Sequence, residues 1–448
     1  MDNSELLYSR SEALYENTSQ NFHIKDRQYS QQYCSLYFQR LASLKSKLRE
    51  VSLARWNIKD NADEVAFPQF IRDTHAGLQN KYVLIGTLYK DMRLKPSALK
   101  EYSESNDIQP NLISYLSEDD FLILEDQTAR LRIYGDAMNP QTFVSGMIVA
   151  ILGILQTDGQ FHVSDWCFTG IPRVIRSAPY GIKDEDLEKP SYVAFVSGLH
   201  IGETEMNSLS LQLLRDFLLG SCGSDEERAL SASITRLIVA GNTFAASTTD
   251  VSALEEVDAF FAQLAPVLAV DLMPGLNDPT TYSLPQQPLH PVLFKQSRRL
   301  TTFKSTTNPY SFLVDKIRFT GTSGQPISDM CAFSSLNALD ALCTTAECRC
   351  IAPTAPDTLP CYPFTKGDPF CIVDDATFPH VLFAGNQANF EHKFLPPTNY
   401  NRDDLKHDDS AIKNNVLMLC IPEFSKLPLA VLVNTRTLAV SSVEFNTS

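Results

Sequence analysis

Four polar residues follow apolar runs at points where they could take part in metal-assisted chemistry. His200, Asn242, Asn277 and Asp278 each come shortly after a stretch of large apolar residues. Imidazole and carboxylate groups that converge at such positions can hold two divalent ions, which deprotonate a bridging water and clamp a phosphate group. Only His200 and Asp278 carry such groups, so we expect that these turns cannot hold two ions.

Three apolar strands, and the helices between them, must position these residues. Strands are predicted at 192–196, 237–240 and 270–273, each ending in a glycine-containing turn, and amphipathic helices at 206–219 and 252–264. Continuous apolar strands separated by helices are typical of a parallel sheet covered on both faces. Such sheets place their sites in the loops beyond the carboxyl ends of the strands.

The turns resemble those of calcineurin-like phosphoesterases in which most metal ligands have been replaced. That class carries Asp-x-His, Gly-Asp-x-x-Asp, Gly-Asn-His-Asp and Gly-His-x-His at its strand ends, and here His200 and Asp278 match two ligand positions. The degenerate positions, where another residue replaces the expected one, are Gly198, Asn242, Ala245, Leu276, Asn277, Asn386 and Ala388. The resemblance implies an inactivated phosphoesterase-like α/β sandwich without catalytic residues, metal or cofactor.

One alternative is a single metal ion held by His200 and Asp278. Two protein ligands are fewer than manganese or zinc sites use. We therefore expect His200 to be hydrogen-bonded within its turn, and Asp278 to cap the segment that follows it.

A set of ordered motifs gives a second, more specific resemblance. The motifs lie at 82–92, 284–290, 307–310, 321–325, 351–359 (IAPTAPDTL), 379–381 and 383–386. In order and spacing they are similar to the B-subunit family, the small second subunits of eukaryotic DNA polymerase delta, over about residues 35–446.

This resemblance implies both a fold and a role. The expected fold is α+β and multidomain, with an OB-fold β-barrel joined to the inactivated sandwich. The expected role is a non-catalytic scaffold of the nuclear DNA polymerase delta complex, in replication and repair synthesis. The expected partners are the cysteine-rich C-terminal domain of the catalytic subunit and a third accessory subunit, with DNA reached only through the complex. Archaeal relatives keep the metal ligands and are nucleases, so the losses place this chain in the inactive branch.

Composition and charge are consistent with a subunit that meets protein partners. Of the 448 residues, 44% are hydrophobic and 20% charged, and the formal net charge is -15. This balance argues against a protein that grips nucleic acid mainly through its phosphates. The longest apolar run, 147–155, is too short to span a bilayer, and no secretory signal opens the chain. We therefore expect an intracellular protein with no membrane segment.

The ten cysteines form neither a disulfide framework nor a standard zinc motif. Cys343, Cys348 and Cys350 are close in sequence, but their spacing matches no common zinc site. We expect them to lie, reduced, in a surface loop.

The chain divides into four predicted segments. These are a flexible N-terminal arm at 1–30, a helix and OB-fold domain at 31–178, a linker at 179–190, and the phosphoesterase-like domain at 191–448. Barrel strands are predicted near 82–88, 121–124, 131–134, 143–155 and 161–166, with a helix at 95–102.

A helix is predicted at 32–51 because large apolar residues recur there at helical spacing. They are Tyr33, Tyr37, Leu41, Leu44 and Leu48, and the basic residues on the other faces are Arg40, Lys45, Lys47 and Arg49. The basic residues could meet an acidic partner, but we favour a solvated face of an amphipathic helix.

Long proline-containing loops at 279–313 and 351–380 need a role once catalysis is removed. Loops of this length are uncommon in compact domains unless they are functional, and proline lowers the entropy lost on docking. We predict a partner-interface loop at Pro353, Pro356, Asp357 and Thr358. Replacing 356–358 by Gly-Ser-Gly is expected to weaken complex assembly while leaving the isolated fold intact.

Three other functions remain open. The chain could be the B-subunit of another replicative polymerase, alpha or epsilon, with the same fold and a different catalytic partner. It could bind single-stranded DNA through barrel aromatics such as Tyr89, Tyr102 and Tyr134, although such residues more often pack in the core or against protein partners. An active phosphoesterase would need ligands outside the positions matched above.

Overall fold

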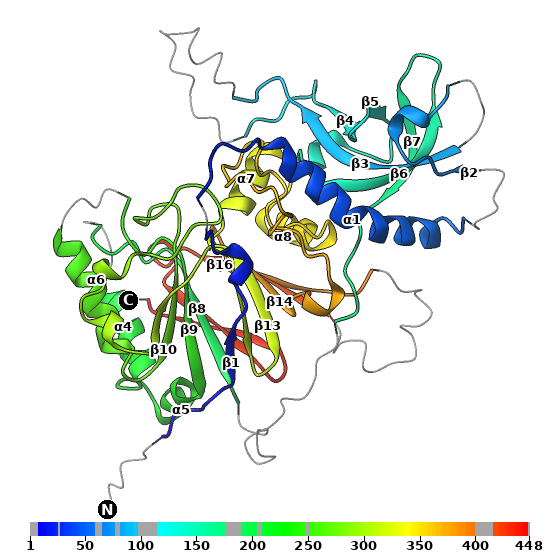
Figure 1. Cartoon of the computed structure of the whole chain (residues 1–448). Helices are drawn as coiled ribbons and strands as arrows, with labels where there is room; N and C mark the ends of the chain where they lie inside the picture. Colours follow the sequence, from blue (N-terminus) through cyan, green and yellow to red (C-terminus); the bar gives the residue numbers. More distant parts are fainter. Residues whose placement is uncertain are drawn as a thin grey trace, which may run out of the picture.

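A computed structural model describes residues 8–25, 27–58, 65–76, 81–96, 114–174, 190–203, 208–246, 251–398 and 415–446. These residues form a small barrel and two six-stranded sheets, with a pair of helices between the barrel and the sheets (Figure 1). Apart from their end residues, the predicted helix at 95–102 and the predicted linker at 179–190 lie outside the described residues.

The barrel is a closed ring of five strands. They are β3 (Lys81–Asp91), β4 (Phe121–Glu125), β5 (Arg130–Tyr134), β6 (Ile148–Leu155) and β7 (Phe161–Cys167). Strand β3 pairs antiparallel with β4 and β6, β4 with β5, and β6 with β7, and a parallel pairing of β5 with β7 completes the ring. A short strand, β2 (Val65–Ala66), lies beside β3. The ring is the predicted barrel, and its closure leaves these five strands without a free edge.

Helix α1 (Cys34–Arg55) crosses the barrel and packs on it. Leu41, Leu44 and Leu48 share one hydrophobic cluster with Ile85 of β3 and Ile148 of β6. The predicted leucine stripe is therefore the face that the helix buries, and the predicted helix is present.

The prediction of a solvated basic face is wrong for Arg40, whose side chain is fully buried. Its Nε donates to Asp368 Oδ2 at 2.7 Å, and its Nη1 donates to the carbonyl oxygens of Gly146 and Pro353. A buried guanidinium is tolerated only when it is paired in this way. Helical spacing could not reveal the burial, because Asp368 is 328 residues away in the sequence.

The two sheets have mixed strand directions. In spatial order, the β9 sheet contains β11 (Phe303–Ser305), β10 (Ala269–Met273), β9 (Ile234–Ala240), β8 (Tyr192–Val196), β17 (Leu429–Asn434) and β18 (Val440–Glu444). The β14 sheet contains β1 (Tyr15–Asn17), β12 (Tyr310–Val314), β13 (Ile317–Thr322), β14 (Val381–Gln387), β16 (Val416–Pro422) and β15 (Glu391–Leu395). Strands β8, β9 and β10 are parallel neighbours, so the three predicted strands are present and their carboxyl ends share one edge.

The two sheets pack face to face over a core rich in phenylalanine. The ring of Phe195 in β8 lies 5.1 Å from that of Phe383 in β14 and 5.9 Å from that of Phe319 in β13, measured between centroids. The helices over the outer face of the β9 sheet are α4 (Ser208–Leu219), α5 (Asp225–Ser233) and α6 (Val251–Leu264). Those between the β14 sheet and the barrel are α7 (Gln325–Phe333) and α8 (Ala338–Glu347).

One hydrophobic cluster runs from the barrel to the β14 sheet without a break. It includes Leu88 of β3, Met330 of α7, Leu342 of α8 and Met418 of β16, each at most 3% exposed. Independent domains have separate cores joined by a linker. Here the barrel and the β14 sheet bury apolar surface against the same two helices.

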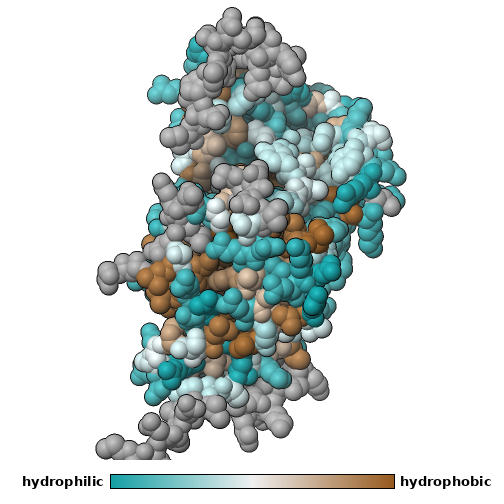
Figure 2. Space-filling model, turned by 90° about the vertical axis from the view of Figure 1, so that its left-hand side faces the viewer, coloured by the Kyte–Doolittle hydropathy of each residue, from teal (hydrophilic) through white to brown (hydrophobic). Residues whose placement is uncertain are grey.

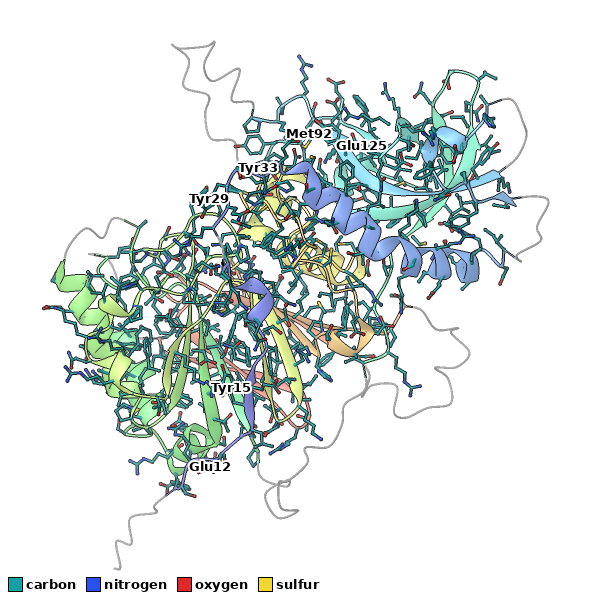
Figure 3. All side chains as sticks on the ribbon, in the orientation of Figure 1. Glu12, Tyr15, Tyr29, Tyr33, Met92 and Glu125 are labelled. Carbon is teal, nitrogen blue, oxygen red and sulfur yellow. The ribbon has the colours of Figure 1, made fainter. Side chains whose placement is uncertain are left out.

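Residues 8–25, which we call the N-terminal strap, lie within the predicted flexible arm and bind along the sheets. Arg10 donates to the carbonyl oxygens of Leu218 and Ser231 in α4 and α5, and β1 pairs antiparallel with β12. Figure 3 shows Tyr15 beside the sheets and Tyr29 further along, toward the start of α1. This stretch is not a free arm, because its backbone hydrogen bonds are made at the edge of a sheet.

The remaining regular elements are short 3-10 helices. They are η1 (Gln20–Phe22), η2 (Ile71–Asp73), η3 (Pro140–Thr142), η4 (Pro291–Leu293), η5 (Ser297–Arg299) and η6 (Asp375–Thr377). Within the described part of the chain, no helix combines the length and the hydropathy needed to cross a membrane.

Candidate functional site

The fold brings the predicted strand-end residues together at one edge of the sheets. The backbone N–H of Gly198 donates to the carbonyl oxygen of Gly241, and that of His200 donates to the carbonyl oxygen of Asn242 at 3.1 Å. The turn after β10 joins them, because the N–H of Asn277 donates to Asn242 Oδ1 at 3.1 Å. The spatial grouping expected from the strand pattern is therefore present.

Asn386 occupies the space that a carboxylate at position 198 would need. Its Nδ2 donates to the carbonyl oxygens of Ala240, at 3.1 Å, and Ser323, at 2.7 Å. A Cβ atom on Gly198 would lie 2.9 Å from Asn386 Oδ1 and 3.0 Å from Glu423 Cα. An aspartate at position 198 would therefore clash with the side chain that now bridges two strand ends.

Asp278 uses its carboxylate to hold backbone rather than to bind a ligand. The side chain is buried, and its two oxygens accept hydrogen bonds from the N–H groups of Phe244, at 2.9 Å, and Gly275, at 2.7 Å. Burial raises the pKa of Asp278 to about 6, although these N–H donors oppose the rise. We expected Asp278 to cap the following segment, which is wrong because its partners come earlier in the chain.

His200 does not complete a metal site. Its Nδ1 lies 3.7 Å from Glu203 Oε2, and its Nε2 is buried without a hydrogen-bond partner among the described residues. Within the ranges that the structure describes, no group of three histidine, cysteine, aspartate or glutamate ligands converges at these strand ends.

The other degenerate positions have no ligand atoms. Ala245 is buried, Leu276 is 53% exposed, and Ala388 is exposed just beyond β14. Hydrocarbon side chains at these three places can neither hold an ion nor activate a water.

The turns keep an unusual backbone although they lack ligands. His200, Asn242 and Asn386 have φ of 48°, 53° and 54°, and Gly198 has φ of 63°. A positive φ is uncommon for residues other than glycine, and asparagine tolerates it well. Asn242 and Asn386 therefore keep their turns in the left-handed region, and their side-chain amides take part in hydrogen bonds. In the sequence, the asparagines that follow the apolar strands were the feature that could have indicated these left-handed, hydrogen-bonded turns.

Two protein-family models match the chain. A model of the "DNA polymerase delta subunit OB-fold domain" matches residues 32–166, which contain α1 and nearly all of the barrel. A second model, which describes the B subunits of DNA polymerases alpha and epsilon, matches residues 193–392, most of the two sheets.

Relatives align over almost the whole chain. The DNA polymerase delta small subunit of Arabidopsis thaliana is 36% identical, with 99% of this chain and 98% of the relative covered. That of Oryza sativa subsp. japonica is also 36% identical, with 98% and 99% covered. The chain belongs to the family of DNA polymerase delta small subunits. DNA polymerase delta subunit 2 of Drosophila melanogaster, 34% identical with 98% and 99% covered, supports the same assignment.

Membership of the delta small-subunit family confirms the resemblance drawn from the motifs, and the OB-fold model confirms the barrel type. The alternative of an alpha or epsilon B-subunit loses support, because each of these nearly full-length relatives is named as a delta subunit.

The predicted interface loop of this delta small-subunit family member makes contacts within the chain. The carbonyl oxygen of Pro353 accepts from Arg40, and Asp357 pairs with Lys95 Nζ at 2.5 Å. Thr358 donates its hydroxyl to Asp329 Oδ2 at 2.6 Å, and Pro356 is half-buried. Replacing 356–358 would therefore also remove contacts to Lys95, beyond β3, and to Asp329 of α7, so we now expect a cost in the stability of the isolated fold.

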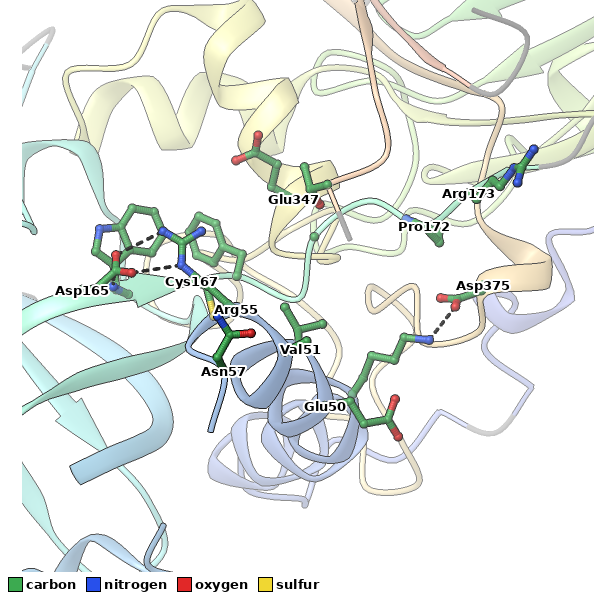
Figure 4. A pocket seen from close by; sticks show the side chains of 16 residues that line it. Glu50, Val51, Arg55, Asn57, Asp165, Cys167, Pro172, Arg173, Glu347 and Asp375 are labelled. Atoms are coloured by element: carbon green, nitrogen blue, oxygen red, sulfur yellow. Dashed lines mark hydrogen bonds and ion pairs between the residues drawn. The ribbon is translucent and has the colours of Figure 1, made fainter. Parts of the chain in front are cut away.

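A pocket of about 830 Å³ lies between α1 and the end of α8 (Figure 4). Its charged side chains are largely paired with one another, with Arg55 Nε 3.1 Å from Asp165 Oδ2 and Lys47 Nζ 2.5 Å from Asp375 Oδ2. Val51 and Pro172 add apolar surface to its wall. These lining residues form no catalytic group. The sequence did not predict the pocket, because its walls come from segments that are distant in the chain.

Proposed function

We propose that this accessory subunit of DNA polymerase delta is a non-catalytic scaffold. It binds the cysteine-rich C-terminal domain of the catalytic subunit and a third accessory subunit, and acts in the nucleus in DNA replication and repair synthesis. The observation that carries the proposal is the filling of the strand-end site by Asn386, whose amide joins the ends of β9 and β13 in place of a metal ligand.

The packing around Asn386 also supports the proposal that the two sheets form a phosphoesterase-type sandwich that does not hydrolyse phosphate esters. Binuclear hydrolysis needs several carboxylate and imidazole ligands at about the same point. Here Gly198 leaves no room for a carboxylate, and Asp278 already accepts two backbone hydrogen bonds. We propose domain limits of 31–178 for the helix and barrel and 191–448 for the sandwich, with 179–190 between them.

Exposed apolar residues support protein partners as the main ligands. Figure 2 shows hydrophobic residues scattered among hydrophilic ones on the side of the molecule that carries α4 and α6. The predicted long loop at 279–313 is wrong from residue 303 onward, because β11 and most of β12 lie there. In its remaining part, the loop at 279–302, Tyr282 is 67% exposed and Val292 is 60% exposed. Tyrosine is enriched at energetically important positions of protein interfaces. We therefore favour this loop over the loop around Pro356 as the surface that contacts a partner.

The deciding experiment is co-purification of the full chain with the cysteine-rich tails of delta, alpha and epsilon catalytic subunits. Stoichiometric capture of the delta tail is expected, with at least tenfold weaker capture of the other two. A Tyr282→Ala, Val292→Ala variant tests the exposed loop, and exposed Thr365→Ala serves as its control. Absence of delta-tail binding, or equal capture of all three tails, would contradict the scaffold proposal.

A second assay addresses catalysis directly. The chain is incubated with Mn²⁺ and an aryl phosphodiester, and no hydrolysis above the buffer rate is expected. Hydrolysis that disappears in an Asp278→Asn variant would show that Asp278, together with ligands outside the matched positions, forms a working site, and would contradict the non-catalytic proposal.

A further inference from the structure

Two cysteines and an aspartate converge away from the strand-end site. The Sγ atoms of Cys350 and Cys371 and a carboxylate oxygen of Asp368 all lie within 4.8 Å of one another. Cys350 is 1% exposed and Asp368 is 8% exposed, while Cys371 is partly exposed. We expected Cys343, Cys348 and Cys350 in a surface loop, which is wrong, because all three are buried. Cys343 lies within α8, and the other two lie just beyond its end.

Backbone pairing sets the distance between the two sulfurs. Cys350 and Cys371 face each other in an isolated antiparallel bridge. The flanking hydrogen bonds run from Ile351 N to the Phe370 oxygen and from Ile372 N to the Arg349 oxygen, both at 2.9 Å. The cysteines are thus a non-hydrogen-bonded pair, the arrangement in which facing side chains approach most closely.

Asp368 is held in place by two partners. Its Oδ1 accepts from the N–H of Phe370 at 2.9 Å, and its Oδ2 pairs with Arg40 Nε at 2.7 Å. Asp368 precedes Cys371 by three residues, a spacing that is common between zinc ligands. The carboxylate is therefore fixed beside the two thiols by contacts that metal binding would leave intact.

The buried charges of the cluster are balanced while the thiols are protonated. The Cys371 thiol donates to Asp368 Oδ2 at 3.5 Å, and Arg40 supplies a compensating cation. The hydrogen bond with Cys350, together with burial, raises the pKa of Cys371 well above its ordinary value.

We propose that Cys350, Asp368 and Cys371 bind one zinc ion. Binding forms two zinc–thiolate bonds and one zinc–carboxylate bond and releases the two thiol protons to solvent. The ion brings two positive charges and the thiolates two negative charges, so the total charge of the cluster, with Arg40, stays at zero. Two thiolates with one carboxylate suit zinc better than calcium or magnesium, which prefer oxygen ligands.

The fourth ligand of a tetrahedral zinc ion is then water. Gly367, next to Asp368, has open space where a Cβ would lie, with no atom within 4 Å. Of the three ligands, Cys371 is the partly exposed one, so an ion and a water molecule would approach the site from its side. The bound ion would tie the loop at 351–370 to itself and, through Asp368 and Arg40, to α1.

The test uses Co²⁺ as a spectroscopic probe on the full-length, reduced, metal-free chain. One ion per chain is expected, with intense near-ultraviolet absorption from thiolate coordination that Zn²⁺ displaces. Cys350→Ser with Cys371→Ser should weaken binding at least tenfold. The control, Cys343→Ser with Cys331→Ser, replaces one buried and one partly exposed thiol elsewhere and should bind as the unaltered chain does. No thiolate absorption in the unaltered chain, or equal loss in both variants, overturns the proposal.

A second measurement needs no substitution, so it stays informative if a variant fails to fold. Alkylation of each cysteine by N-ethylmaleimide is followed by peptide mass with and without Zn²⁺. Zinc should slow the alkylation of Cys350 and Cys371 at least tenfold and leave Cys331 unchanged. Equal rates with and without the ion, or a Cys350–Cys371 disulfide whose reduction restores no metal binding, would exclude the site.

Discussion

At the scale of single residues, asparagine side chains hold the strand-end turns together. Asn242 and Asn386 both have a positive φ and both use side-chain amides to join neighbouring strand ends. A carboxylate could accept these bonds only in part, and it would bring a charge that no ion neutralises. Neutral amides at these two positions therefore hold the turns together without adding a buried charge.

Buried Lys90 gives a prediction about pH. Its Nζ donates to the carbonyl oxygen of Phe333 at 2.9 Å and lies 3.8 Å from Asp120 Oδ2, and burial lowers its pKa from 10.5 to about 8. Between these two values the folded chain binds fewer protons than the unfolded chain, so stability should rise with pH. Relative to Lys90→Met, the free energy of unfolding should increase by roughly 3 kcal/mol across this window.

Urea unfolding at several pH values measures this difference. The exposed Lys81, on the same strand, supplies the control, because Lys81→Met keeps Lys90 and should therefore keep the rise of stability with pH. A difference between the unaltered chain and Lys90→Met that does not vary with pH would show that Lys90 titrates normally.

At the scale of elements, the loop at 353–358 holds helices and barrel together. Replacing 356–358 by Gly-Ser-Gly removes the Asp357–Lys95 pair and the Thr358–Asp329 hydrogen bond and adds backbone freedom. The isolated chain should lose about 2 kcal/mol of unfolding free energy, measured in urea. The same replacement at 365–367, where Thr365 and Lys366 are exposed, should cost about 0.5 kcal/mol or less. Unchanged stability together with weakened assembly would instead restore the original interface prediction.

At the scale of the whole molecule, the shared cluster predicts that the barrel and the β14 sheet lose structure together. Met330 of α7 is fully buried where the two meet, and Met330→Ala should cost about 2–5 kcal/mol. Amide hydrogen exchange should quicken in β3 and β6 as well as in α7. Leu264→Ala, in the cluster outside the β9 sheet, should quicken exchange around α6 instead. Faster exchange confined to α7 in the Met330 variant would indicate independent domains.

The sequence by itself determined which segments are strands, which helix face is apolar, and which residue types stand at the strand ends. Alternating or helical spacing reports the apolar side of an element, so Leu41, Leu44 and Leu48 were predicted correctly as the buried face of α1. The family followed from motifs that occur in order along the chain. That Gly198 and Ala245 carry no metal-ligating side chain could be read directly from residue types.

Only the tertiary structure decided which hydrogen-bond and ion-pair partners stabilise the buried polar groups. Arg40 and Lys90 look like surface residues by type, and each is buried because an oxygen far along the chain meets it. The filling of the strand-end site by Asn386, and the approach of Cys350 to Cys371, likewise join residues that no local pattern relates. The spacing of apolar residues indicates which face of a helix or strand is buried on average. A buried charge, in contrast, is stabilised by one particular partner, which this spacing does not reveal.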